Sequence, residues 1–153
     1  MAWYFAYGSN MVVERMRERG ASFSTSRPAI LRDHRLAFDK RGRDGTARAN
    51  VERAAGARTF GVVYELASDA LDVLAQFESG YDLVDVLVEV PRPDGGLQVF
   101  QARTFVARPD RKTAADPSRS YVELILEGVK QHGLPEAARL EILRAASKKP
   151  GAR

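Results

Sequence analysis

The sequence predicts an α+β domain, and two kinds of pattern support this fold class. Segments 59–66 and 83–90 alternate in the direction of their apolar side chains with a period of two residues, which is typical of strands. Segments 69–79 and 120–132 carry apolar residues at the three- and four-residue spacing of amphipathic helices. Strands and helices alternate along the chain, so the sequence predicts a sheet with helices packed outside it.

Length and charge bound the class of protein. A chain of 153 residues is expected to form one domain, which we place at 1–146, followed by a basic polar tail at 147–153. The 24 Lys and Arg exceed the 20 Asp and Glu by 4, a balance that permits nucleic-acid binding without requiring it. The excess lies mainly in a glycine-containing loop at 40–45 and in the tail. We expect solvated surface at both places and no nucleic-acid partner.

The absence of cysteine excludes disulfides, thiolate zinc sites and a cysteine nucleophile. The two histidines, His34 and His132, are far apart and have no ligand spacing around them, so we expect no metal site and no cofactor. No apolar run approaches the roughly 20 residues of a spanning helix, and the N-terminus has no basic leader. These features predict a cytoplasmic protein, monomeric or homodimeric, without a membrane partner.

The first ten residues change from strand character to helix character at one point. Residues 3–7 are aromatic and apolar, and Gly8 breaks this strand before an amphipathic helix at 11–17 that Ser9 or Asn10 would cap. A strand that turns into a helix N-terminus presents unpaired N–H groups and a partial positive charge. Such a corner suits an anion or a developing oxyanion.

The middle of the chain is predicted to hold strands and a helix bearing a carboxylate. The strands are expected at 22–31, 35–39, 47–52 and 59–66, with an interruption near 32–34 and a turn at 55–58. Ser68 would cap a helix at 69–79 that Gly80 ends. Glu78 continues the apolar face formed by Leu71, Leu74 and Ala75. A carboxylate on a buried face near a helix C-terminus should have a raised pKa.

The C-terminal half is predicted to contain a hairpin and two helices. The predicted elements are strands 83–90 and 97–106 joined by a turn at 93–96, a polar loop at 111–118, and helices at 120–132 and 136–146. Ser120 and Glu123 have the spacing of a capping box, and Gly133 would close the first of these helices.

Three common enzyme motifs are incomplete. Gly8-Ser9 lacks the glycine two positions after the serine that a nucleophile elbow needs. The glycines required for a dinucleotide-binding turn do not follow Gly8, and no Gly-Lys-Ser or Gly-Lys-Thr element forms a P-loop. Serine-hydrolase and nucleotide chemistry are therefore set aside.

Several segments together resemble the γ-glutamylcyclotransferases. The stretch from Tyr4 to Asn10, followed by Met11, resembles the opening signature of that family. Gly61–Tyr64 resembles its central strand, Gln76-Phe77-Glu78 resembles the segment with its general-base glutamate, and Tyr121 with the later His132–Pro135 resembles its C-terminal segment. The connection after Glu78 is shorter than in the family pattern.

The resemblance implies a mixed, strongly curved sheet tending to a small barrel, with the site at its mouth. It also implies an acyl-transfer enzyme of lyase type that uses no cofactor. The α-amine of a γ-glutamyl amino acid or amine would attack its own γ-carbonyl and release 5-oxoproline, with Glu78 as general acid and base. The implied substrate-binding residues are Tyr4, Phe5, Ala6, Tyr7, Gly8, Ser9, Asn10 and Tyr121.

Some alternatives remain open at this stage. The N–H groups at Gly8–Asn10 could bind the substrate α-carboxylate or the γ-oxyanion. Glu78 could instead be a structural residue paired with an arginine, and Tyr121 a core tyrosine hydrogen-bonded to backbone. A non-catalytic binding module of the same fold is the alternative function. The identity of the departing amine is not fixed by these residues.

Overall fold

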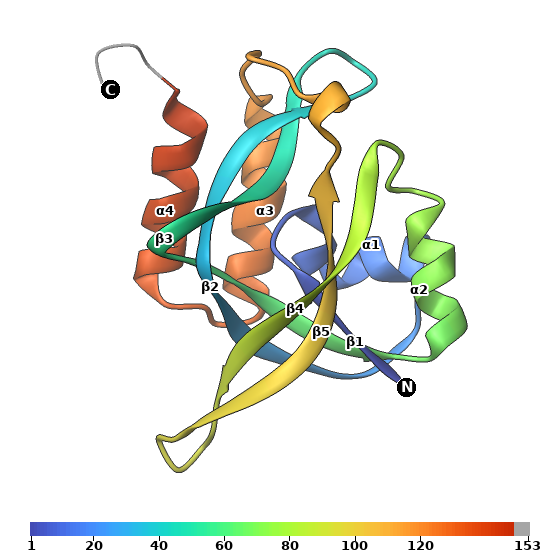
Figure 1. Cartoon of the computed structure of the whole chain (residues 1–153), viewed down its shortest axis with the longest axis vertical. Coiled ribbons are helices and arrows are strands. Elements are labelled where there is room, and N and C mark those ends of the chain that lie inside the picture. Colours follow the sequence, from blue (N-terminus) through green and yellow to red (C-terminus); the bar gives the residue numbers. More distant parts are fainter. Residues whose placement is uncertain (149–153) are drawn as a thin grey trace.

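A computed structural model of the chain describes residues 1–148, in which five strands form a barrel with helices around it (Figure 1). The strands are β1 (Ala2–Ala6), β2 (Phe23–Arg41), β3 (Ala47–Leu66), β4 (Tyr81–Pro91) and β5 (Leu97–Ala107). The α-helices are α1 (Val13–Glu18), α2 (Ser68–Ala75), α3 (Arg119–Gln131) and α4 (Glu136–Ser147), and the short 3₁₀ helices are η1 (Ser9–Met11) and η2 (Pro109–Arg111).

The sheet is mixed and closes on itself in the order β1-β3-β2-β4-β5. β1 pairs antiparallel with β3 and parallel with β5. The pairing between β2 and β4 is short, because these strands meet only at Ile30 opposite Glu89 and Leu31 opposite Val88. α3 and α4 lie on one side of the barrel and α2 on the opposite side (Figure 1). The predicted α+β class, with a curved mixed sheet and helices outside, is confirmed.

β2 and β3 are each continuous and form one long hairpin. The turn predicted at 55–58 and the interruption predicted near 32–34 are therefore both wrong. The pairing shifts from Arg32 opposite Arg58 to His34 opposite Arg53, which leaves extra residues on β3. The N–H of Gly56 donates to Asp33 Oδ1 at 3.0 Å across this irregularity. A bulge that absorbs extra residues bends a strand without ending it.

The core joins the barrel to α3 through a close contact at Gly128. A Cβ on Gly128 would lie 2.7 Å from the Cβ of Met11, so only glycine lets α3 approach η1 this closely. The largest fully buried side chains are Tyr64, Phe5, Phe38, Met11, Met16, Leu31, Leu66, Leu74, Ile125, Val51, Val62 and Val63. η1 is therefore held between the sheet and α3.

The predicted capping residues differ from those in the structure. α1 begins at Val13, and neither Ser9 nor Asn10 caps it, because residues 9–11 form η1 and the Asn10 side chain bonds elsewhere. Ser118 caps α3 by accepting a hydrogen bond from the N–H of Tyr121 at 3.2 Å, in place of the predicted Ser120 box.

α2 is shorter than predicted and carries no Glu78. The helix begins at Ser68, which is its first residue and not its cap, and ends at Ala75, whose side chain is exposed. The N–H of Phe77 then bonds to Leu74 O and that of Glu78 to Ala75 O, which continues the chain as a tight turn. Glu78 is therefore placed by this turn and not by a helix face.

The side chain of Lys148 attaches the end of α4 to the segment before α3. α4 ends at Ser147, and Lys148 has a left-handed backbone (φ 44°), with Nζ donating to Ala115 O at 2.6 Å. The rest of the basic tail predicted at 147–153 lies outside the described residues. Within residues 1–148, no helix is both long and apolar enough to cross a membrane.

Candidate active site

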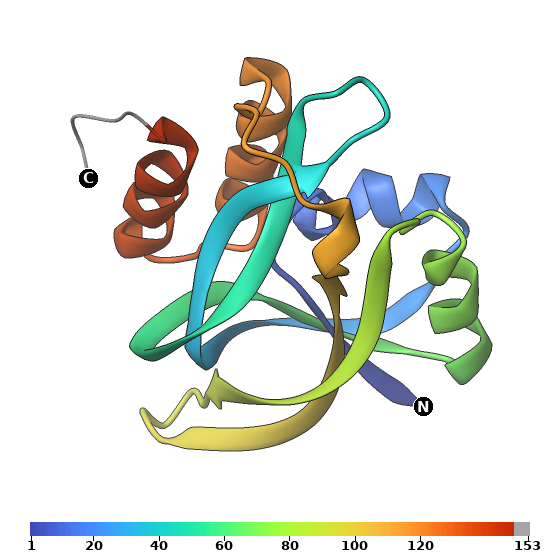
Figure 2. The same cartoon turned by 45° about the horizontal axis from the view of Figure 1, so that its top comes forward.

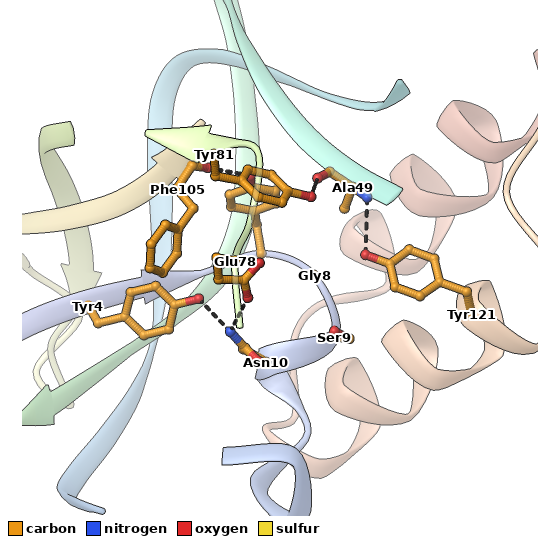
Figure 3. Close-up of a pocket in the computed structure, with 10 residues that line it drawn as sticks. Tyr4, Gly8, Ser9, Asn10, Ala49, Glu78, Tyr81, Phe105 and Tyr121 are labelled. Carbon is orange, nitrogen blue, oxygen red and sulfur yellow. Dashed lines mark hydrogen bonds between the residues drawn. The ribbon is translucent and has the colours of Figure 1, made fainter. Parts of the chain in front are cut away.

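A pocket opens where the end of β1, η1 and the Glu78 turn meet (Figure 3). Its empty volume, which includes space open to solvent, is about 310 Å³. Tyr4, Tyr7, Gly8, Ser9, Asn10, Ala49, Glu78, Tyr81, Phe105 and Tyr121 line it. The pocket is thus walled by four tyrosines and contains one carboxylate.

Asn10 is fixed at the centre of this wall by both its backbone and its side chain. Tyr64, which is fully buried, donates its hydroxyl proton to the carbonyl oxygens of Asn10 (2.8 Å) and Met11 (3.0 Å). Asn10 Nδ2 then donates to Tyr4 Oη at 2.9 Å and to Glu78 Oε1 at 3.0 Å (Figure 3). Asn10 therefore links β1 to the turn after α2.

Glu78 is paired with Arg19, which follows α1. Arg19 donates to Glu78 Oε1 at 2.8 Å and to Asn10 Oδ1 at 3.0 Å, and the side chains of the pair are only 14% and 16% exposed. Burial raises the pKa of Glu78, while the charge and hydrogen bond of Arg19 and the hydrogen bond of Asn10 oppose the rise. The raised pKa agrees with the sequence prediction, and the arginine contact is the one expected for a structural glutamate.

The four pocket tyrosines divide into two pairs by the direction of their hydrogen bonds. Tyr7 donates to Phe105 O, and Tyr81 donates to Ala49 O at 2.7 Å, so both hydroxyl protons are used on backbone. Tyr4 accepts from Asn10, and Tyr121 accepts from the N–H of Ala49 at 3.0 Å.

Tyr4 and Tyr121 consequently keep a hydroxyl proton that can be donated. Burial is the main cause that raises the pKa of each above that of a free tyrosine, so both stay protonated at neutral pH. These two tyrosines are donors that a bound anion or carbonyl oxygen could use.

Gly8 lies at the narrowest part of the pocket. Its φ is −118°, so its backbone conformation does not require glycine. The surrounding space favours glycine, because a Cβ there would lie 3.2 Å from the Cβ of Ala49 and 3.5 Å from Tyr121 Oη. The hydrogen bonds formed among residues 1–148 include none donated by the N–H groups of Gly8, Ser9 or Asn10, as expected for the first turn of a helix.

Most residues predicted for the site come together, and two do not. Tyr4, Tyr7–Asn10, Glu78 and Tyr121 all line the pocket. Phe5 and Ala6 do not line it, since both are completely buried in the core. The alternation of a strand turns Phe5 away from the face that Tyr4 occupies.

Sequence reasoning missed four residues at the site. Tyr81, Phe105 and Ala49 line the pocket, and Arg19 pairs with its carboxylate. Tyr81 could have been noticed as an aromatic residue just past the Glu78 turn. Nothing local distinguishes Arg19, which is one of several arginines near α1 and lies 59 positions from Glu78. Among the described residues, no cluster of three or more carboxylates and histidines could hold a metal ion.

Comparison with known proteins assigns this chain to a family. The family described as "Gamma-glutamyl cyclotransferase, AIG2-like" matches residues 4–123. The chain is 28% identical over 137 residues to the gamma-glutamylcyclotransferase of Homo sapiens, covering 86% of this chain and 72% of that protein. It is also 28% identical over 140 residues to that of Mus musculus, covering 87% and 72%.

A solved structure named gamma-glutamyl cyclotransferase superposes with a TM-score of 0.75 at 27% identity, covering 93% of this chain and 86% of that one. Because the family match spans well over half of the sequence, the chain belongs to the AIG2-like gamma-glutamyl cyclotransferase family.

Proposed function

We propose that this chain is a γ-glutamylcyclotransferase that releases 5-oxoproline from a γ-glutamyl amino acid or amine, with Glu78 as general acid and base. The observation that carries the proposal is a mostly buried carboxylate in a small pocket whose lining also supplies hydrogen-bond donors. Glu78 is the only carboxylate among the residues that line this pocket. The family relationship of the whole chain is in agreement with the proposal.

The reaction joins two ends of one molecule. The α-amine nitrogen forms a bond to the γ-carbonyl carbon, the bond from that carbon to the departing nitrogen breaks, and the α-amine proton leaves with the departing amine. Since nucleophile and electrophile belong to the same substrate, a pocket that holds the folded rotamer can gain much of the rate from proximity.

Glu78 is suited to move the proton. The hydrogen bonds from Asn10 and Arg19 both reach Oε1, which leaves Oε2 to face the substrate. Burial makes the carboxylate more basic than a free glutamate, and Arg19 keeps its ionised form accessible. Glu78 takes a proton from the substrate ammonium so that the neutral amine can attack, and gives this proton to the departing nitrogen as the carbon–nitrogen bond breaks. It then removes the second proton that the attacking nitrogen loses and passes it to the released amine, which regenerates the carboxylate. General acid-base help of this kind is typically worth about 10²–10⁴-fold.

The part of the pocket lining around Glu78 supplies donors for the negative charge of the substrate. It consists of the N–H groups of Gly8–Asn10 and the hydroxyl groups of Tyr4 and Tyr121. Two negative groups need these donors, the α-carboxylate throughout and the γ-oxyanion in the transition state. With two kinds of donor, backbone N–H and tyrosine hydroxyl, this lining can serve both groups.

The test is a panel of γ-glutamyl amino acids and γ-glutamyl amines, with 5-oxoproline measured as product. Release of 5-oxoproline that depends on Glu78 is expected. If the protein binds γ-glutamyl compounds in its pocket and converts none of them, it is a binding module of the same fold, and the ion pair of Glu78 with Arg19 is then structural.

A further inference from the structure

Outside the pocket lies a much wider cavity, here called the basic basin, with an empty volume of about 1600 Å³. It shares Ser9, Glu78, Tyr81 and Tyr121 with the pocket, so the two are continuous past the carboxylate. The β2–β3 loop, η2 and the turn after α2 gather around it on the side where α1 lies (Figure 2). A group attached to a γ-glutamyl unit in the pocket can therefore extend past Glu78 into this basin.

The basic basin contains a strong excess of positive charge. Seven of the 24 Lys and Arg in the chain line it, against one of the 20 Asp and Glu, which is Glu78. Six of the cations come from α1, from the residue that follows it and from the β2–β3 hairpin: Arg15, Arg19, Lys40, Arg41, Arg43 and Arg48. Arg111 is the seventh. The loop at 40–45, expected from sequence to be plain solvated surface, therefore faces the approach to the candidate active site.

Few of these charges are neutralised by the protein. Arg19 is paired with Glu78, Arg48 lies 3.6 Å from Asp44, and the long contact of Arg111 is with Asp110 at 3.9 Å. Among residues 1–148, no ion pair involves the other four, Arg15, Lys40, Arg41 and Arg43. Like charges held together without counter-charges repel, and a bound anion would relieve that repulsion.

Arg15 adds an independent observation. Its Nε is the single side-chain nitrogen or oxygen in the described part of the chain that is buried without a hydrogen-bond partner. Burial, followed by the neighbouring charge of Arg19, lowers the pKa of Arg15. A buried donor without an acceptor is costly, and a water molecule or a bound anion would supply the missing acceptor.

Gly80 makes room for two of these seven cations, Lys40 and Arg111, close to Glu78 in the chain. Its φ of 89° favours glycine, and a Cβ there would lie 2.8 Å from Lys40 Cε and 3.2 Å from Arg111 Cγ. The short turn that follows Glu78 thus allows both side chains to lie against it, within the region where a departing amine would leave.

We propose that the basic basin holds the departing amine of the substrate and that this amine carries anionic groups, so that the preferred substrates are γ-glutamyl amides of acidic amines. This inference rests on the proposed function. The shared chemistry is an anionic oxygen presented to Arg and Lys, and its source can be a carboxylate, as in γ-glutamyl-glutamate, or a phosphate ester, as in γ-glutamyl-phosphoethanolamine. The reaction is unchanged, with the acidic amine released beside 5-oxoproline.

The experiment compares kcat/KM within two matched pairs of substrates. The pairs are γ-glutamyl-glutamate with γ-glutamyl-glutamine, and γ-glutamyl-phosphoethanolamine with γ-glutamyl-ethanolamine. At low salt we expect the acidic member of at least one pair to be favoured by about tenfold or more, and the preference to shrink as salt rises, because exposed charges are screened. Whichever pair gives the larger ratio identifies the anion.

Three variants test whether the preference for acidic substrates arises in the basic basin. Replacing Arg41 and Arg43 together by glutamine is expected to lower the acidic-to-neutral ratio several-fold, whereas Arg92→Gln in the distant β4–β5 hairpin should leave it unchanged. Arg15→Gln is expected to lower the ratio as well, because the buried donor loses its charge.

The outcomes separate this inference from the proposed function. If 5-oxoproline forms from the neutral substrates as readily as from the acidic ones at low salt, the inference is overturned and the proposed function stands. A ratio that the Arg41 and Arg43 double variant does not change overturns the assignment to the basin. If no substrate yields 5-oxoproline, the proposed function fails and the inference fails with it.

Discussion

Two arginine–glutamate pairs with similar contact distances have opposite surroundings. Arg19 and Glu78 meet at 2.8 Å in the pocket wall, with side chains 14% and 16% exposed. Arg32 and Glu89 meet at 2.6 Å on the outside of the barrel, with side chains 56% and 24% exposed. A surface pair is typically worth about 0–1 kcal/mol. A buried pair must overcome the desolvation of two charges, so its presence calls for a reason other than stability.

The comparison teaches that the burial of both partners, and not the contact distance, distinguishes the pair of Glu78 from the pair of Glu89. The pKa of Glu78 is raised by burial even though Arg19 opposes the rise. Glu78 also touches Asn10, which belongs to the segment that lines the pocket. The two pairs therefore form a matched set in which the same substitution should have different effects.

The largest expected effect is on turnover. Glu78→Gln keeps the shape of the side chain and removes its ability to take a proton, so kcat/KM for 5-oxoproline release should fall by about 10²–10⁴-fold. Glu89→Gln, on the outer surface, should retain the activity of the unmodified protein. Similar activity in both variants would assign the base to another residue, and the burial of the Glu78 pair would then have no catalytic role.

The second prediction tests how closely the pocket is fitted. Gly8→Val adds a side chain whose Cβ alone would lie 3.2 Å from the Cβ of Ala49. The added atoms should displace the substrate, and a displacement of about 1 Å can lower the rate by up to about 10²-fold. Because φ at Gly8 is −118°, we expect the variant to fold. Gly96→Ala in the β4–β5 hairpin is the control, and circular dichroism checks both folds. Normal turnover by the Gly8 variant would mean that this loop only joins β1 to η1 and does not bind substrate.

The third prediction uses Arg19 to shift the pH profile. Arg19 lowers the pKa of Glu78, so Arg19→Gln should raise it further. Attack requires the ionised carboxylate, and the acidic limb of kcat/KM should therefore move to higher pH. Arg17→Gln in the neighbouring helix α1 should leave the limb in place, because the pair of Arg17 with Glu14 is exposed. If the limb does not move in the Arg19 variant, the observed ionisation belongs to another group.

Sequence patterns predicted the sheet, its helices and most of the pocket, because these depend on local periodicity and on residues that are near one another in the chain. Tyr4, Tyr7 and Gly8 lie on one strand and its turn, so their association needs no tertiary information. The patterns failed where tertiary contacts override local preference. Asn10 caps no helix, because its side chain instead contacts Tyr4 and Glu78.

Long-range pairing explains the other failures. The turn expected around Gly56 became a bulge, because β3 continues along β2 on both sides of it. Arg19 and the cations of the β2–β3 loop gained their neighbours only when the barrel closed. Their charge was visible in the sequence, but its orientation toward the approach to Glu78 was not.

The smallest expected effect concerns stability, and its sign separates the two interpretations of Glu78. The folded-state pKa of Glu78 is raised, so the folded protein holds the proton more tightly than the unfolded chain does. The resulting stabilisation is fully present below the unfolded pKa and is lost as pH rises through the folded one. At neutral pH the ionised carboxylate therefore costs stability, which a neutral glutamine avoids while still accepting hydrogen bonds from Arg19 and Asn10.

Glu78→Gln should accordingly melt at a higher temperature than the unmodified protein at neutral pH, and the difference should narrow as pH falls through the folded pKa of Glu78. Glu89→Gln, in the exposed pair, should change the melting temperature little at either pH. The measurement is thermal melting of the three proteins across this pH range. A Glu78 variant that melts lower at neutral pH would mean that the attraction of Arg19 outweighs the desolvation of Glu78. The buried pair would then be a structural contact, as the exposed pair is.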